Sequence, residues 1–206
     1  MSVLLRRARP ADLAAIMRLE RDTFADDAWP EDAMRRELGS EHGYYLVAVD
    51  GEAEADSAGD EPTDADGADS ERADASGAVY AYAGLLAPRG SGQGDIQTIA
   101  VDPEHRGTGL GRVLMQALIA EARRRDAEHV FLEVRADNPV ARGLYASLGF
   151  AELGVRPGYY RHGIDAVIMR LEVAPAVTRP AVAERTVAER TGAATESNDP
   201  TGEDLR

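Results

Sequence analysis

Three glycines crowd one short turn of this chain, and their surroundings constrain its fold more than any other feature of the sequence. The stretch IAVDPEHRGTGLGRVLM, residues 99–115, begins as an apolar strand, passes through a turn and continues as an amphipathic helix. Gly107, Gly109 and Gly111 fall where the helix begins, and glycine lets a backbone come close to a ligand. A helix start also offers unpaired N–H groups and the positive end of the helix dipole. The pattern therefore predicts an anion site, for which a diphosphate is the natural occupant.

Several readings of this turn are open. A Walker loop is excluded because it needs a lysine, and every basic residue of the chain is an arginine. A Rossmann oxidoreductase stays possible because Glu133 lies 22 residues past Gly111, where a ribose-binding acid could stand, although the glycines are spaced GxGxG rather than GxGxxG. The plainest alternative is a glycine-rich turn that binds nothing.

The rest of the sequence alternates between strand and helix patterns. Apolar runs predict strands over residues 2–9, 43–49, 78–86, 95–101, 129–135, 150–156 and 165–173. Helical spacing, with proline at the starts and glycine at the ends, predicts helices over residues 10–24, 31–38, 108–125 and 139–149. Asn138 is a candidate cap for the last of these helices. This order predicts an α+β fold with helices packed around a mixed sheet.

The net charge of −14 belongs mainly to one segment. Residues 50–77 hold 11 acidic residues and one arginine, with almost no large apolar side chain. Such a composition cannot offset the entropy of ordering, so we expect a disordered acidic insert at 51–77. The insert interrupts a domain spanning residues 1–173, and residues 174–206 are expected to form a flexible low-complexity tail.

Composition also limits the class of partner and the compartment. The chain has no cysteine, which excludes disulfides, thiolate metal sites and a cysteinyl acyl-enzyme. No apolar run approaches the length of a membrane span or a signal-peptide core, so we expect a cytoplasmic protein without a membrane partner. Basic residues form no stripe with interleaved aromatics, and nucleic acid is therefore not an expected partner.

Four segments together resemble the GCN5-related N-acetyltransferases (GNAT), and within them the ribosomal-protein-alanine N-acetyltransferases. They are AWPED, IAVDPEHRGTGLGR, FLEVRADNPVARGLYASLGF and RPGYYRHGIDAVIM. The resemblance implies a GNAT fold, with a mixed, mostly antiparallel sheet, and the use of acetyl-CoA without a metal. It implies transfer of acetyl to the α-amine of an N-terminal alanine, on a small-subunit ribosomal protein. It also implies that coenzyme A is held by Ile99, Ala100, Val101, Arg106, Gly107, Thr108, Gly109, Leu110, Gly111, Arg112 and Asn138.

Acetyl transfer from a thioester to an amine needs a neutral amine, a stabilised oxyanion and a proton for the departing thiolate. By resemblance, Glu133 is the base, Tyr145 protonates the sulfur, and the backbone of residues 99–101 meets the oxyanion. Glu133 interrupts an apolar strand, and period two turns it away from its core-facing neighbours. The alternatives are a glutamate in solvent or paired with Arg135, and a tyrosine that only packs in the core.

Trp29, Tyr159 and Tyr160 are candidate contacts for the substrate peptide, with aromatic packing as the alternative. His105, His129 and His162 show no metal-ligand spacing and are interpreted as surface residues. Residues 123–125, three arginines, are interpreted as a solvated helix face. Two further functions remain open: an acetyltransferase for a small amine, and a catalytically silent acyl-CoA-binding module.

Overall fold

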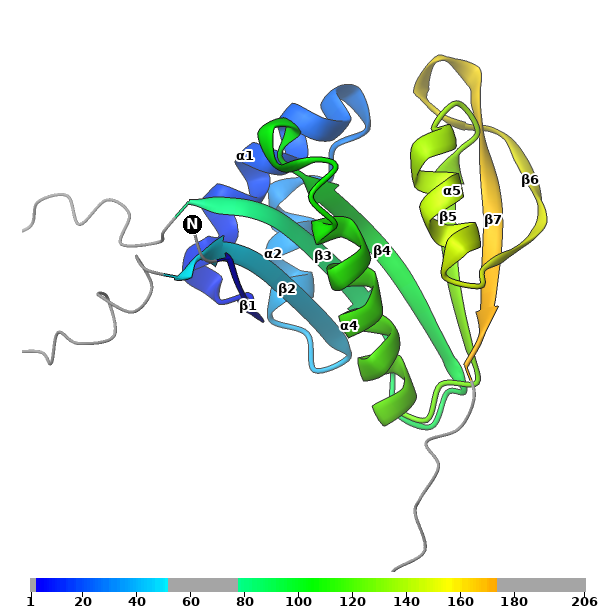
Figure 1. Cartoon of the computed structure of the whole chain (residues 1–206), viewed down its shortest axis with the longest axis horizontal. Helices are drawn as coiled ribbons and strands as arrows, with labels where there is room; N and C mark the ends of the chain where they lie inside the picture. Colours follow the sequence, from blue (N-terminus) through cyan, green and yellow to red (C-terminus); the bar gives the residue numbers. More distant parts are fainter. Residues whose placement is uncertain (1–2, 52–77, 174–206) are drawn as a thin grey trace, which may run out of the picture. The chain divides into compact units, whose positions relative to one another are not determined.

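The computed structural model of the chain describes residues 3–51 and 78–173, which form one seven-stranded sheet flanked by helices (Figure 1). The acidic insert and the tail expected from the sequence lie outside the described residues. The strands are β1 Val3–Arg7, β2 Gly43–Asp50, β3 Val79–Leu86, β4 Gln93–Val101, β5 His129–Arg135, β6 Ala151–Tyr160 and β7 Ile164–Glu172. The helices are α1 Leu13–Phe24, α2 Glu31–Leu38, α4 Leu110–Arg124 and α5 Pro139–Ser147, with short 3-10 turns η1 Pro10–Asp12, η2 Ala25–Asp27, η3 Pro103–His105 and η4 Arg161–Gly163.

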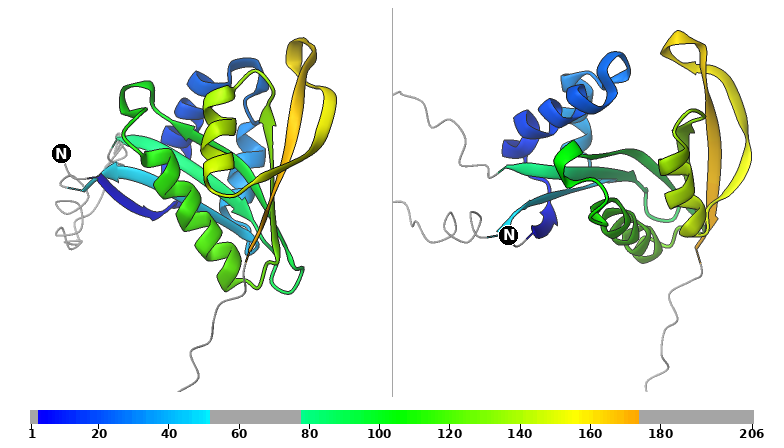
Figure 2. Two further views of the ribbon diagram at one scale, coloured as in Figure 1. Left: turned by 45° about the vertical axis from the view of Figure 1, so that its right-hand side comes forward. Right: turned by 45° about the horizontal axis from the view of Figure 1, so that its top comes forward.

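The sheet carries one layer of helices on each face (Figure 2). Helices α1 and α2 cover β2, β3 and β4 on one face, where Ile16, Met17, Met34 and Tyr82 are buried. Helix α4 covers the other face, and Leu114, Met115 and Leu118 along its apolar stripe form a second buried cluster with residues of β5, α5 and β7. The sheet therefore separates an α1 face from an α4 face.

The strand order is β1-β2-β3-β4-β5-β7-β6, and β4 with β5 is its parallel pair. That pair is short, because residues 93–96 align with residues 129–132 and no pairing continues beyond them within the described sheet. Residues 98–101 of β4 stay paired with β3, while the end of β5 stays paired with β7. The two halves of the sheet thus part after Ile96 and Leu132. A doubly wound Rossmann sheet, the alternative left open by the sequence, is excluded by this order.

A β-bulge in β4 sits where the halves part. The register against β3 shifts between Gly84 and Leu85, which leaves Gln97 as the extra residue of β4. Gln97 and Thr98 both turn to the α1 face, where Gln97 accepts a hydrogen bond from the Tyr45 hydroxyl at 2.7 Å. Bulges bend a strand and increase its local twist. The bulge therefore re-aims the second half of β4.

The expected α+β architecture and its order of elements are confirmed, with two local differences. Strand β6 runs on through Pro157 to Tyr160 instead of ending at Arg156. It is an edge strand, and proline is tolerated there because its missing N–H has no ladder partner to lose. Arg125 was expected in solvent, but it is buried and bonds to Glu121, at 2.7 Å, and to two backbone carbonyls. Among the described helices, none is long and apolar enough to cross a membrane.

Candidate active site

The glycine-rich turn has the backbone geometry of an anion site. Gly107 and Gly109 have φ values of 76° and 93°, a backbone conformation that residues with a side chain rarely adopt. Gly109 is the N-cap of α4. A Cβ built at either glycine would meet nothing within 4 Å. Within the described chain, the N–H groups of residues 107–111 donate to no backbone carbonyl. They surround open space at the positive end of the α4 dipole, which suits a diphosphate.

Side chains around the turn are already engaged within the protein. Arg106 donates from Nε to the Val101 carbonyl at 3.0 Å, and Thr108 donates to the His105 carbonyl at 2.7 Å. Arg112 reaches across from α4 to the Ser147 hydroxyl at the end of α5, at 2.8 Å. Asn138 caps α5 by accepting from the Ala141 N–H at 3.0 Å, as its sequence context predicts. Leu110 packs its side chain against the core on the α4 face.

The end of β4 presents free backbone groups to the gap between the two halves of the sheet. Asp102 donates to the Tyr80 carbonyl at 2.8 Å, which fixes the alternation of the β3–β4 ladder. By that alternation the backbone groups of Ile99 and Val101 point away from β3, toward the side where β5 has diverged. Ala100, in contrast, turns its N–H and C=O toward Tyr82 of β3. The backbone groups of Ile99 and Val101 are therefore the ones available for the oxyanion and pantetheine role.

Glu133 lies on the α1 face of β5, just past the point where the strands part. Its neighbours Leu132 and Val134 are buried on the α4 face, so the alternation expected from the sequence is confirmed. The Glu133 side chain is 27% exposed and pairs with the Arg156 guanidinium at 2.9 Å, not with Arg135. A hydrogen bond to Glu133 raises the pKa of Tyr159, and the guanidinium of Arg156 lies 4.9 Å from the centre of that ring. The candidate base is thus held in a polar cluster on strands β5 and β6.

Two further groups share this face with Glu133. Tyr160 donates its hydroxyl to the Glu133 carbonyl at 3.4 Å, and burial together with the Glu133 charge raises the pKa of Tyr160 to about 12. The Tyr159 and Tyr160 rings meet edge to face at 5.0 Å. Asp95 on β4 also has a raised pKa, caused first by partial desolvation and then by Glu133. The structure therefore brings Tyr159, Tyr160 and Asp95 close to the candidate base.

Tyr145 approaches from the other face of the sheet. It lies in α5, is 6% exposed and belongs to the core cluster of the α4 face. Burial raises the pKa of its hydroxyl, and Tyr160 adds a smaller upward shift, so the two phenols lie within electrostatic range. Its phenol therefore stays protonated at neutral pH. Glu133 on the α1 face and Tyr145 on the α4 face are thus connected through Tyr160.

Trp29 is half-buried in the connection between α1 and α2, where it packs against the buried cluster of the α1 face. Its segment is also tied to the other half of the sheet. Asp27 accepts from Arg135 Nη1 at 2.8 Å and from the Arg161 N–H at 3.0 Å. The connection between α1 and α2 and the turn between β6 and β7 therefore meet above the α1 face.

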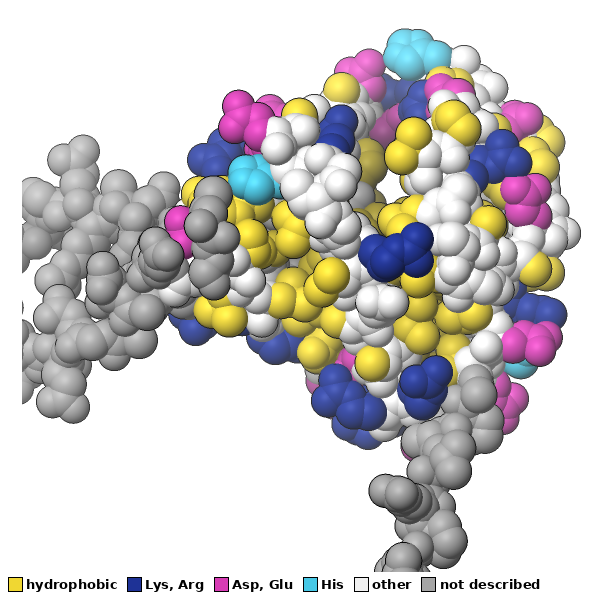
Figure 3. Space-filling model, in the orientation of Figure 1, with side chains coloured by type: hydrophobic (Ala, Val, Ile, Leu, Met, Phe, Trp, Pro, Cys, Tyr) yellow, Lys and Arg dark blue, Asp and Glu magenta, His cyan; other side chains and the backbone are white. Residues whose placement is uncertain are grey.

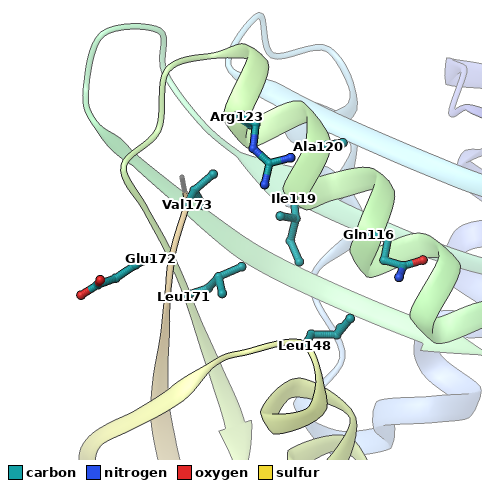
Figure 4. A pocket seen from close by; sticks show the side chains of 8 residues that line it. All are labelled: Gln116, Ile119, Ala120, Arg123, Leu148, Leu171, Glu172 and Val173. Atoms are coloured by element: carbon teal, nitrogen blue, oxygen red, sulfur yellow. The ribbon is translucent and has the colours of Figure 1, made fainter. Parts of the chain in front are cut away.

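A hollow separates the two halves of the sheet in the space-filling view (Figure 3), between the side of the molecule with the α4 N-terminus and the side with α5. A different cavity of about 440 Å³ lies lower, between α4, the end of α5 and the end of β7 (Figure 4). It contains none of the candidate site residues and is lined by Gln116, Ile119, Ala120, Arg123, Leu148, Leu171, Glu172 and Val173. Among the residues described, no group of three or more His, Cys, Asp or Glu side chains is placed to hold a metal ion.

In this mixed sheet, β4 and β5 separate after a short parallel pairing, a glycine-rich turn follows β4, and Glu133 lies on β5 across the gap. This combination is typical of an acyl-CoA-dependent N-acetyltransferase. The acetyltransferase (GNAT) family model matches residues 13–150, and the chain belongs to that family. Its relatives include the N-alpha-acetyltransferase RimI of Mycobacterium tuberculosis, 36% identical over 164 residues, which cover 78% of this chain and 86% of that protein.

Two further comparisons concern Escherichia coli. The [ribosomal protein bS18]-alanine N-acetyltransferase of strain K12 is 46% identical over 79 residues, covering 37% of this chain and 53% of that protein. The crystal structure of the ribosomal-protein-S18-alanine N-acetyltransferase superposes with a TM-score of 0.65 at 26% identity, covering 86% of this chain and 98% of that one. The chain is thus an N-acetyltransferase of the RimI type that depends on acetyl-CoA.

Several residues of the site escaped the sequence analysis. Arg156 stands two strands away from Glu133, and its pairing depends on the β6–β7–β5 order, which no local pattern encodes. Asp27 and Arg135 are distant in sequence and meet only through the fold. Arg156 does lie inside the RPGYY segment that carries the resemblance, and an arginine beside two tyrosines was a usable signal.

Proposed function

We propose that the protein transfers acetyl from acetyl-CoA to the α-amine of a protein N-terminus, with alanine as the preferred first residue. The observation that supports the proposal is the position of Glu133 just past the end of the β4–β5 pairing, with Tyr145 buried on the opposite face of the sheet. Such a gap lets the amine arrive on the α1 face while the thioester lies on the α4 face. The proposed transfer is direct, and the absence of cysteine excludes a cysteinyl acyl-enzyme.

Cofactor binding rests on backbone groups more than on charged side chains. The unpaired N–H groups of residues 107–111 would hold the pyrophosphate at the start of α4. The outward backbone groups of Ile99 and Val101 would hold the pantetheine arm and meet the oxyanion. The Asn138 amide, whose oxygen caps α5, keeps its NH₂ group for the cofactor.

In the chemical step, Glu133 removes a proton from the substrate ammonium, directly or through water. A free α-amine has a pKa near 7.8, so about one in seven is already neutral at pH 7. The neutral nitrogen attacks the thioester carbonyl, forming a C–N bond and an oxyanion. The oxyanion collapses with loss of the thiolate, which takes its proton from Tyr145. The excess proton on the new amide nitrogen leaves through solvent, and solvent returns a proton to the Tyr145 phenolate. Burial raises the pKa of the Tyr145 phenol, and the same dry surroundings raise the proton affinity of the thiolate.

The choice of substrate rests on the relatives and on the peptide face. The name of the Escherichia coli relative gives its substrate as an alanine of ribosomal protein bS18, and we extend that class to this chain. A cytoplasmic ribosomal protein agrees with the location expected from the sequence. Tyr159 and Tyr160 lie beside Glu133, and Asp27 ties the connection that carries Trp29 to Arg135 and Arg161. These aromatic residues would line the approach of the peptide, and acidic Asp95 would favour an incoming ammonium.

A mass-spectrometric screen tests this function. Peptides with varied first residues, each with an internal lysine, are incubated with the protein and acetyl-CoA. We expect one acetyl group on the α-amine, fastest for alanine, and none on lysine, whose pKa near 10.4 keeps it charged. Faster acetylation of polyamines or antibiotics than of any peptide would favour the small-amine alternative. No turnover with preserved acetyl-CoA binding would favour the silent module.

A further inference from the structure

A buried carboxylate that the acetyl-transfer chemistry does not use lies beneath the peptide face. Glu20 in α1 is 1% exposed. One of its oxygens accepts the N–H of Trp29 at 2.9 Å. The other accepts the hydroxyl of Tyr82 on β3 and that of Thr98 on β4, the latter at 3.4 Å. A single carboxylate thus joins α1, the connection between α1 and α2, and two central strands.

These partners are the elements that shape the two sides of the reaction. Thr98 belongs to the bulge that turns the end of β4 toward the gap. Trp29 lies in the connection between α1 and α2, which the proposed function places against the peptide. Asp27 in the same connection accepts hydrogen bonds from Arg135 and from the Arg161 N–H. Between Glu20 and Trp29 the chain passes through Ala25 at φ 45°, a strained conformation for a residue with a side chain. Such strain persists only where contacts on both sides over-determine the backbone.

We propose that Glu20 is a positioning residue for peptide binding, whose carboxylate fixes the Trp29 segment against the bulged end of β4. Its bond to Trp29 holds the connection between α1 and α2, and its bonds to Tyr82 and Thr98 fasten that connection to the central strands. The inference rests on the proposed function and adds a residue that touches neither the amine nor the thioester.

Trp29 is the only tryptophan of the chain, so its fluorescence reports on this segment without any activity measurement. In Glu20→Ala we expect the acrylamide quenching constant of Trp29 to rise about twofold, since the segment loses an anchor. With an alanine-ended peptide, we expect the peptide KM to rise by about tenfold while kcat falls less. Acetyl-CoA affinity, measured by calorimetry, should stay within about twofold, because residues 107–111 do not contact Glu20.

Glu172→Ala is the matched control. Glu172 is a carboxylate at the end of β7, and it pairs on the surface with Arg170 at 3.2 Å. No hydrogen bond or ion pair joins it to the connection between α1 and α2 in the described part of the chain, so its removal should leave Trp29 quenching and the peptide KM at their wild-type values. If Glu20→Ala does not unfold cooperatively, Glu20→Asp replaces it, because a carboxylate withdrawn by about 1.5 Å cannot reach both partners.

Unchanged Trp29 quenching and peptide KM in a folded Glu20 variant overturn the proposal. A parallel loss of peptide binding, acetyl-CoA affinity and melting temperature overturns it as well, since it marks a purely structural residue. If the wild-type protein acetylates no peptide, the proposed function fails by itself. In that case, a rise in Trp29 quenching with unchanged acetyl-CoA affinity in Glu20→Ala still shows that Glu20 holds the connection between α1 and α2 in place.

Discussion

At the scale of single residues, Tyr145 is the proposed donor of a proton to the departing sulfur. Tyr145→Phe keeps the ring that packs near Phe150, with centroids 6.1 Å apart, and removes only the donor. We expect kcat to fall by about 10²-fold with little change in stability. An acetyl thioester with a more acidic leaving thiol needs less protonation and should recover part of that rate. Equal losses with both thioesters would show that Tyr145 has a packing role alone.

Glu20 gives a second residue-level prediction, about stability and pH. Burial raises the pKa of Glu20, so the folded chain binds this proton more tightly than the unfolded chain. Its contribution to the free energy of unfolding is therefore present in acid and lost as the pH rises through the folded-state pKa. Glu20→Gln does not titrate, so its stability relative to wild type should improve between about pH 4 and pH 7. Urea midpoints at both pH values measure this, and an equal difference at both would contradict it.

At the scale of elements, the turn before α4 should bind the diphosphate through its backbone. Gly109→Val should weaken acetyl-CoA binding by about tenfold or more, equivalent to about 1.4 kcal/mol, because a side chain there fills the space left for the ligand. The substitution also strains the backbone at φ 93°. Gly90→Val is the matched control, with φ 77° and the same open surroundings in a turn remote from the gap. Calorimetry showing equal affinities for both variants would reject the backbone cradle.

The elements themselves were largely predictable because their signals are local. Gly39 follows α2 directly, and β5 occupies the predicted residues 129–135. What the sequence could not supply depends on distant partners. The burial of Arg125 requires the carbonyls of His42 and Ala87, and the continuation of β6 past Pro157 requires an edge position in the sheet. The bulge at Gln97 also has no local signature, since it arises from the pairing with β3.

At the scale of the whole molecule, the fold should not need the acidic segment between β2 and β3. Val49 pairs with Val79, so the two strand ends are neighbours that a short turn can join. Deleting residues 52–76 leaves Gly51 and Gly77 adjacent, and a Gly-Gly pair suits a tight hairpin. We expect cooperative unfolding and kcat to persist. Loss of either would contradict this, while a rate change that vanishes in high salt would indicate electrostatic steering of a basic substrate.

The candidate site was predictable in its local parts and not in its assembly. The glycine spacing predicted the turn, and strand alternation predicted that Glu133 faces away from the core. The two-sided geometry follows from the parting of β4 and β5 after Ile96, which depends on the whole sheet. Arg156 as the partner of Glu133 likewise depends on the placement of β6 two strands away.

The most direct test of the proposed acetyl transfer, with Glu133 as its base, is the pH–rate profile of Glu133→Gln with a short peptide that begins with alanine. The substitution keeps the shape of the side chain and removes the base. Between about pH 6 and pH 9, we expect kcat to fall by about 10²–10⁴-fold at the acid end. The loss should shrink as the pH passes the amine pKa near 7.8, since the substrate then arrives neutral, and acetyl-CoA affinity should be unchanged. Wild-type kcat across the whole range would place the base elsewhere and contradict the assignment of Glu133.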